Sequence, residues 1–259
     1  QAAYEVEVFE NHIEVIQSIH KECSPAVNWD DISNSDQPSE PKREEINELQ
    51  ARSHADLYKP SIIDRLFKRE PKKRAALAQK ISDAIEEDEG IYIKSINDWK
   101  KDIEDWKLAK DIATKLLDGD HAAKIEAIKY LEPFSEIVNL GSNLSISINE
   151  QGITEVNIRV HGTEIVPKRA KSLLKSGKLS EKDMPKSRFN ELYQDYVCSC
   201  ALRAANETFS VLTDDQVIVN AVDELLNSQT GHLEEEPILS ILFSRSSIAK
   251  LNLDSIDPS

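Results

Sequence analysis

Residues 187–212, SRFNELYQDYVCSCALRAANETFSVL, predict a long helix around which the rest of the chain can be arranged. Apolar residues recur there at intervals of three and four, which is the helical period: Phe189, Tyr193, Tyr196, Val197, Cys200 and Ala204. Ser187 is a suitable N-cap. From residue 196 to 205 only Ser199 and Arg203 are strongly polar. A helix with so little polar surface must be covered on more than one side.

The segments on either side of this helix alternate with the period of two that indicates strands. Residues 144–148, 156–160 and 164–166 predict a three-stranded meander, with turns at 150–152 and at His161-Gly162. Residues 167–186 are basic and are interpreted as a loop. Two further strands are expected at 217–222 and 238–243, joined by the polar loop 227–237. Near the start of the chain, residues 4–9 also alternate and predict a strand, followed by a helix at 10–23 and a long loop containing Trp29.

Residues 42–131 have a helical pattern almost throughout, with helices expected at 46–57, 61–67, 72–118 and 122–131. Tyr92, Trp99 and Trp106 repeat every seventh residue and share one face. Gly90 leaves two alternatives, either a continuous helix that tolerates a cost of about 1 kcal/mol or a hairpin turn. Gly119 is the expected C-cap.

The predicted class is α+β, with an antiparallel or mixed sheet of about five to six strands packed on the helix at 187–212. The strand at 4–9 has no partner inside a helical region. We therefore expect residues 1–35 and 133–259 to form one discontinuous domain, and residues 42–131 to form an inserted helical hairpin or coiled-coil arm.

Composition limits the function classes. The net charge of −15 disfavours non-specific nucleic-acid binding, because acidic surfaces repel phosphate. No apolar run reaches the ~18 residues that span a bilayer. The three cysteines, Cys23, Cys198 and Cys200, favour a reducing, cytoplasmic compartment. Because the chain starts at Gln1 without an initiator Met, we expect it to be a piece of a longer protein.

Three strings resemble a bacterial protein family of unknown function: MPKSRFNELYQDYVCSCALRAANETF at 184–209, VNWDD at 27–31 and TGHLEEEPILSI at 230–241. Members of that family carry a small β-rich N-terminal domain of unknown function ahead of this region. The resemblance implies a bacterial cytoplasmic protein without that domain. It supplies no catalytic residues.

An enzyme alternative comes from the order helix, three strands, helix, strand, which resembles restriction-endonuclease-like folds. Such a metal-dependent nuclease would use Glu155, Glu164 and Lys168, with Mg²⁺ held by the carboxylates. The required Glu-x-Lys is incomplete, because Val166 stands where the lysine should be. Otherwise no cofactor is expected. His232 with the neighbouring glutamates lacks metal-site spacing, and Cys198 and Cys200 point apart on a helix.

The preferred interpretation is an interaction or scaffolding protein that associates with itself or with a protein partner. The aromatic stripe of Tyr92, Trp99 and Trp106 would pack inside a helical hairpin or form an oligomer interface. The basic residues Lys168, Arg169, Lys171 and Lys175 would contact an anionic partner, or would form an ordinary solvated loop.

Overall fold

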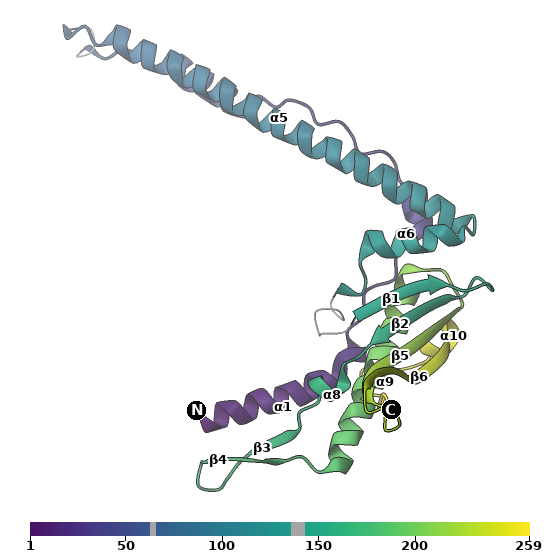
Figure 1. The fold of residues 1–259 in the computed structure, drawn as a ribbon. Helices are drawn as coiled ribbons and strands as arrows, with labels where there is room; N and C mark the ends of the chain where they lie inside the picture. The colour runs from purple at the N-terminus through teal and green to yellow at the C-terminus, as the bar shows by residue number, and fades with distance from the viewer. Residues whose placement is uncertain (63–65, 136–142) are drawn as a thin grey trace. The chain divides into compact units, whose positions relative to one another are not determined.

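The computed structural model describes residues 1–62, 66–135 and 143–259 (Figure 1). The chain forms two compact units, one made of Gln1–Asp30 with Ile112–Ser259 and the other of Asp31–Asp111. We call them the sheet unit and the arm. None of the helices in the described part of the chain combines the length and the apolar composition that a bilayer crossing needs.

The sheet unit is built on a mixed four-stranded sheet, so the predicted α+β class is confirmed. The strand order is β1-β2-β5-β6, with β2 and β5 parallel and the two outer pairs antiparallel. The bounds are Asn143–Ile148 for β1, Thr154–Arg159 for β2, Gln216–Leu226 for β5 and Leu233–Ser244 for β6. A separate hairpin pairs β3, Arg169–Leu173, with β4, Leu179–Asp183.

The predicted central helix is confirmed as α9, Lys186–Val211, although its N-cap is Pro185 and not Ser187. It packs on one face of the sheet, where alternate residues of β2 and β5, among them Val156, Ile158 and Val219, are fully buried. On another side α9 contacts α1, Ala2–Ser18, and the short 3₁₀ helix η1, Ile19–Lys21. These two covers explain why α9 carries so little exposed polar surface.

The predicted strand at residues 4–9 is wrong, because these residues lie in α1. Val6 and Ile16 are buried and Phe9 and Ile13 are half-buried, a helical spacing that a six-residue window is too short to reveal. The strand pairing that motivated the discontinuous domain is therefore absent. The N-terminal segment contacts the C-terminal half as a helix instead, through α9, β3 and β4.

The predicted third strand of the meander and the basic loop are also wrong. Residues 162–165 form the short helix α8, Gly162–Ile165, after His161 adopts a left-handed backbone with φ 47°. Residues 167–186 contain the β3–β4 hairpin, which closes where Gly177 has φ 76°. A two-stranded ribbon of mostly polar residues has little apolar alternation, so its sequence looks like a loop.

The long helix α5, Glu70–Leu117, passes through Gly90 without a break, so the hairpin-turn alternative is wrong. Gly119 ends it as predicted: with φ 81°, the N–H of Gly119 donates to Leu116 and that of Asp120 to Lys115, the paired bonds of a Schellman cap. The expected helix at 61–67 includes residues 63–65, which lie outside the described residues. The other helices are α2 at Trp29–Ser33, α3 at Ile46–Asp56, α6 at His121–Leu131 and α10 at Arg245–Ile248.

Gly90→Ala is expected to stabilise α5 by about 0.5–1 kcal/mol, because glycine in a helix interior loses more backbone entropy on folding. A Cβ at this position would meet no atom within 4 Å, so nothing in the described structure opposes the change. Thermal unfolding followed by circular dichroism measures the effect. A fall in stability would show that the chain turns at Gly90.

Candidate interaction surfaces

The aromatic stripe of the arm is packed against residues of the same chain. We call residues 35–45, which precede α3, the strap. Nε1 of Trp99 donates to the carbonyl of Pro38 at 2.9 Å, and Nε1 of Trp106 donates to Oγ of Ser35 at 2.9 Å. Nζ of Lys110 lies 5.0 Å from the centre of the Trp106 ring. Trp99 and Trp106 are half-buried and both indole N–H groups are occupied, so these two residues of the stripe are used within the arm. Tyr92, the third, is also half-buried.

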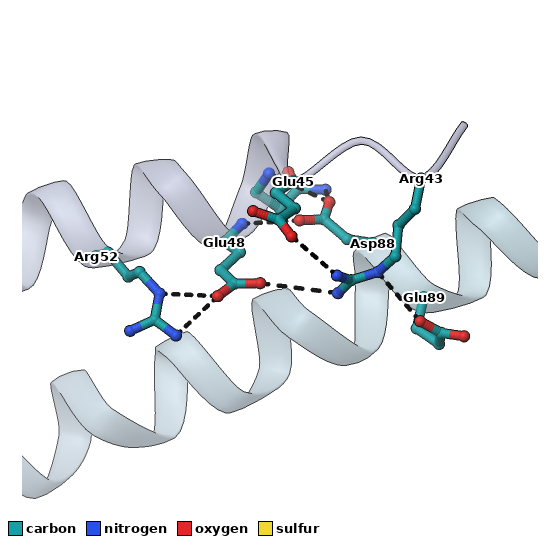
Figure 2. A network of polar contacts seen from close by, with 7 residues as sticks. Arg43, Glu45, Glu48, Arg52, Asp88 and Glu89 are labelled. Atoms are coloured by element: carbon teal, nitrogen blue, oxygen red, sulfur yellow. Dashed lines mark hydrogen bonds and ion pairs between the residues drawn. The ribbon is translucent and has the colours of Figure 1, made fainter. Parts of the chain in front are cut away.

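Asp88, in the middle of α5, caps α3 from outside that helix (Figure 2). Its Oδ2 accepts the backbone N–H of Glu48 at 2.9 Å, and its Oδ1 accepts the backbone N–H of Asn47 at 3.2 Å and the Asn47 amide at 2.8 Å. These are the amides that an N-cap side chain normally satisfies, and the N-cap residue Glu45 makes no such bond. Asp88 therefore fixes where α3 begins along α5.

An ionic cluster surrounds this cap. The Arg43 guanidinium lies 3.1 Å from both Glu45 and Glu89, and 3.7 Å from Glu48, so it joins the strap, α3 and α5 (Figure 2). Arg52 adds a bridge to Glu48 one turn along α3 at 2.7 Å. Partly exposed pairs are individually weak. Their joint effect is to hold one register between α3 and α5.

Asp88→Asn is expected to loosen α3, because an amide offers a single acceptor and no charge to the helix N-terminus. At neutral pH, hydrogen exchange of the α3 amides should become faster by on the order of tenfold. The control is Asp98→Asn, at an exposed site of α5, the helix that also carries Asp88. Unchanged exchange in Asp88→Asn would show that the cap does not hold α3.

The pH dependence of exchange has a definite sign. The backbone N–H of Glu48, helped by Asn47 and Arg43, lowers the pKa of Asp88 from its ordinary value of 3.8. Because the pKa of Asp88 is lower in the folded state, its ionised carboxylate stabilises α3. This stabilisation is fully present above the unfolded-state pKa and is lost as the pH falls through the folded-state pKa. Protection of α3 in the wild type should therefore fall toward that of Asp88→Asn only below about pH 4.

The side of α3 that points away from α5 exposes three large apolar residues beside the polar residues Gln50 and Ser53. Ile46 is 56 % exposed, Leu49 is 61 % exposed and Leu57, just after the helix, is 72 % exposed. We call Ile46, Leu49 and Leu57 the α3 face.

The basic residues predicted to meet an anionic partner lie on and around the β3–β4 hairpin, and two of them already have acidic neighbours. Arg169 lies 3.5 Å from Glu181, and Lys171 lies 3.5 Å from Glu5 of α1. Lys168 precedes β3, and Lys175 is exposed in the hairpin turn. The segregated positive charge is therefore smaller than the sequence suggested, and contact with an anionic partner stays a prediction.

The three residues of the nuclease alternative lie on different elements. Glu155 is the second residue of β2, where Oε1 accepts a hydrogen bond from Asn149 at 3.0 Å. Glu164 is exposed in α8, beyond the other end of that strand, and Lys168 follows it. From Glu155 to the last residue of β2, four residues on, the strand rises about 13 Å. The two glutamates therefore lie toward opposite ends of β2, whereas a shared Mg²⁺ needs oxygens within about 2–3 Å of it.

A buried ion pair in α9 was missed by the sequence interpretation, which counted Arg203 only as a polar interruption. Nε of Arg203 donates to Oε1 of Glu207 at 2.7 Å, and the two side chains are 6 % and 0 % exposed. Glu207 Oε1 also accepts the N–H of Ser24, and Arg203 Nη1 donates to the carbonyl of Ile19. The pair therefore ties α9 to the segment that follows α1.

Neither cysteine of α9 is arranged as a nucleophile. Burial raises the pKa of the Cys200 thiol to about 12. Burial and, to a smaller extent, the negative charge of Asp195 raise the pKa of the Cys198 thiol. Both thiols are therefore protonated at neutral pH, and a thiol attacks only as its thiolate.

Asp223, 1 % exposed, follows the parallel part of β5 and holds the chain where β2 ends. Its Oδ2 accepts the N–H of Gly162 at 3.0 Å and the hydroxyl of Tyr193 at 2.9 Å. Burial and then this hydrogen bond raise the pKa of Tyr193 above its ordinary value. A Cβ on Gly162 would lie 2.5 Å from the Tyr193 ring, so only glycine fits there. Oδ2 therefore positions the start of α8, while Oδ1 accepts the N–H of Glu224 at 2.8 Å.

An open pocket of about 510 Å³ lies at the opposite end of the parallel pair. Lys124 and Asp214 meet there at 2.8 Å, and Asp214 also accepts from Thr154 Oγ1 at 2.7 Å. The described residues contain no group of three or more His, Cys, Asp or Glu side chains that could hold a metal ion. These groups satisfy one another and leave no chemistry assigned to the pocket.

Comparisons of the chain with protein-family models, with curated proteins and with solved structures give no match. The interpretation of its function therefore rests on its own residues.

Proposed function

We propose that this protein is an interaction or scaffolding protein, and that the α3 face of the arm is the surface that binds its partner. The observation that carries this proposal is the orientation of α3, which is the opposite of that of an ordinary amphipathic helix. The helix turns Asn47 and Glu48 toward Asp88 and leaves Ile46 and Leu49 in solvent. A short helix is rarely stable alone and normally buries its apolar side. Here polar contacts hold the helix in place and leave the side chains of Ile46 and Leu49 available to a partner.

The partner chemistry follows from the shape and composition of this face. Isoleucine and leucine at positions 46, 49 and 57 recur at helical intervals, which suits an amphipathic helix packed alongside, from another protein or from a second copy of the arm. The three free cysteines support a reducing compartment, as would suit a cytoplasmic scaffold. A bacterial origin stays an expectation from the resemblance.

Site-specific photo-crosslinking in cells tests the proposal. A photoreactive amino acid in place of Leu49 is expected to give one adduct of defined mass, and the same residue in place of Leu108, exposed elsewhere on α5, is expected to give none. Ile46→Glu should suppress the adduct by placing charge in an apolar interface. Absence of an adduct from position 49, or equal adducts from both positions, would contradict the proposal.

A further inference from the structure

The free edge of β6 is shaped to pair with a second copy of the same strand. Within the described residues, β6 is the last strand of the sheet and its substantial contacts are with β5 and α10. A bulge at residue 238, where Ala221 pairs with Leu239 and Val222 with Pro237, leaves residues 239–244 as the regular part. Charged residues, proline and bulges are the devices that blunt strand edges. In β6 they lie before this regular part, at Glu234–Glu236, Pro237 and residue 238.

The pairing of β6 with β5 determines which backbone N–H and C=O groups of β6 point to the free edge. The N–H of Arg245 donates to Asp215, in the same register that pairs Phe243 with Val217 and Ile241 with Val219. In an antiparallel ladder, hydrogen-bonded pairs alternate with non-hydrogen-bonded ones. Odd-numbered residues of β6 therefore use their N–H and C=O groups on β5. The N–H and C=O groups of Ser240 and Leu242 point to the free edge.

The side chains agree with this geometry. On the face toward α9, Leu239, Ile241 and Phe243 are only half-buried, whereas their neighbours Val217 and Val219 on β5 are fully buried. A further strand alongside β6 would complete these apolar rows. On the other face Leu242 is 54 % exposed next to Ser240.

We propose that residues 239–243 of two copies pair antiparallel about a twofold axis at Ile241, joining two four-stranded sheets into one of eight strands. The register sets Ser240 opposite Leu242 of the second copy, so the four outward-facing backbone groups of each strand find partners. Leu239 lies opposite Phe243 of the second copy, and Ile241 lies opposite Ile241 of the second copy. Apolar residues therefore face apolar residues on the α9 side. The acidic runs at 234–236 lie at opposite ends and do not face each other.

Sedimentation equilibrium and disulfide trapping test this pairing. The wild type is expected to dimerise reversibly at micromolar concentrations, since a five-residue edge is a small interface. Leu242→Glu should weaken dimerisation at least about tenfold, and Leu233→Glu, at an exposed site of the same strand outside the paired segment, should leave it unchanged. Ile241→Cys should oxidise to a covalent dimer, because Cα atoms of opposed residues lie about 4.5–5.5 Å apart.

Three results would overturn the pairing. The first is a wild type that stays monomeric at 100-fold higher concentration with no Ile241→Cys dimer. The second is trapping by Ser240→Cys alone, which would require another register. The third is a dimer that survives Leu242→Glu and is lost in Ile46→Glu/Leu49→Glu, which would place self-association on the arm. This inference does not depend on the proposed function of the α3 face.

Discussion

Replacing Arg203 by methionine is expected to lower the free energy of unfolding of the sheet unit by about 3–5 kcal/mol. Methionine fills much of the same space, but it leaves the Glu207 carboxylate buried in α9 without its cation. An uncompensated buried charge is far more costly than the loss of one surface contact. Glu207 is fully buried and has few other partners with which to compensate.

The double variant Arg203→Met/Glu207→Gln separates this cause from lost packing. Glutamine keeps an oxygen for the N–H of Ser24 and carries no charge, so the double variant should regain at least about 2 kcal/mol of the loss. Urea unfolding is followed through Trp29, which is buried in the sheet unit, with Trp99 and Trp106 replaced by Phe. A cost below about 1 kcal/mol for the single variant, or no recovery in the double, would contradict this account.

The pair Trp99→Ala/Trp106→Ala is expected to cost about 2–4 kcal/mol of local stability in the arm, less than two fully buried indoles would. Both rings are half-buried under the strap, and both donate a hydrogen bond to it. Hydrogen exchange of residues 35–56 should therefore accelerate strongly. The urea transition reported by Trp29 should not move, because Trp29 lies in the other unit.

Trp99→Phe/Trp106→Phe is the matched control, since it keeps the apolar rings and removes the two indole donors. Its exchange rates should lie between those of the wild type and of the alanine pair. If instead the alanine pair left exchange of the strap unchanged and altered the oligomeric state, the stripe would be an intermolecular interface.

The sequence predicted best the elements whose periodicity is long or deeply buried. Residues 187–212 and 72–118 differ from α9 and α5 by one or two residues at each end. The strands near 144–148, 156–160, 217–222 and 238–243 were also found, and in the second of them Val156 and Ile158 alternate with polar neighbours. Such patterns arise from burial on one face and are local in the chain. The predicted loop at 227–237 is too long, because β5 runs to Leu226 and β6 begins at Leu233.

The errors came from features that depend on distant residues. Tyr4, Val6 and Val8 alternate as a strand would, yet contact with α9 selects a helix in which Tyr4 and Val8 stay exposed. The helix α8 begins because Asp223, 61 residues away, holds Gly162. Asp88 looked like one more acid in EEDEG, and no local signal announces that it caps α3 across 40 residues. The candidate interaction surface changed from the aromatic stripe to the α3 face for the same reason. The strap that covers the stripe has no periodic pattern, so the sequence did not reveal it.

Hydroxyl-radical footprinting, with rates normalised to each residue's intrinsic reactivity, tests the central claim about the arm most directly. In dilute purified protein Ile46 and Leu49 should be modified readily, and Trp99 and Trp106 should be protected by the strap. In cells Ile46 and Leu49 should become protected while Leu108 stays reactive. Fast modification of Trp99 and Trp106 in the purified protein, with protection only in cells, would contradict the account and make the aromatic stripe the partner surface.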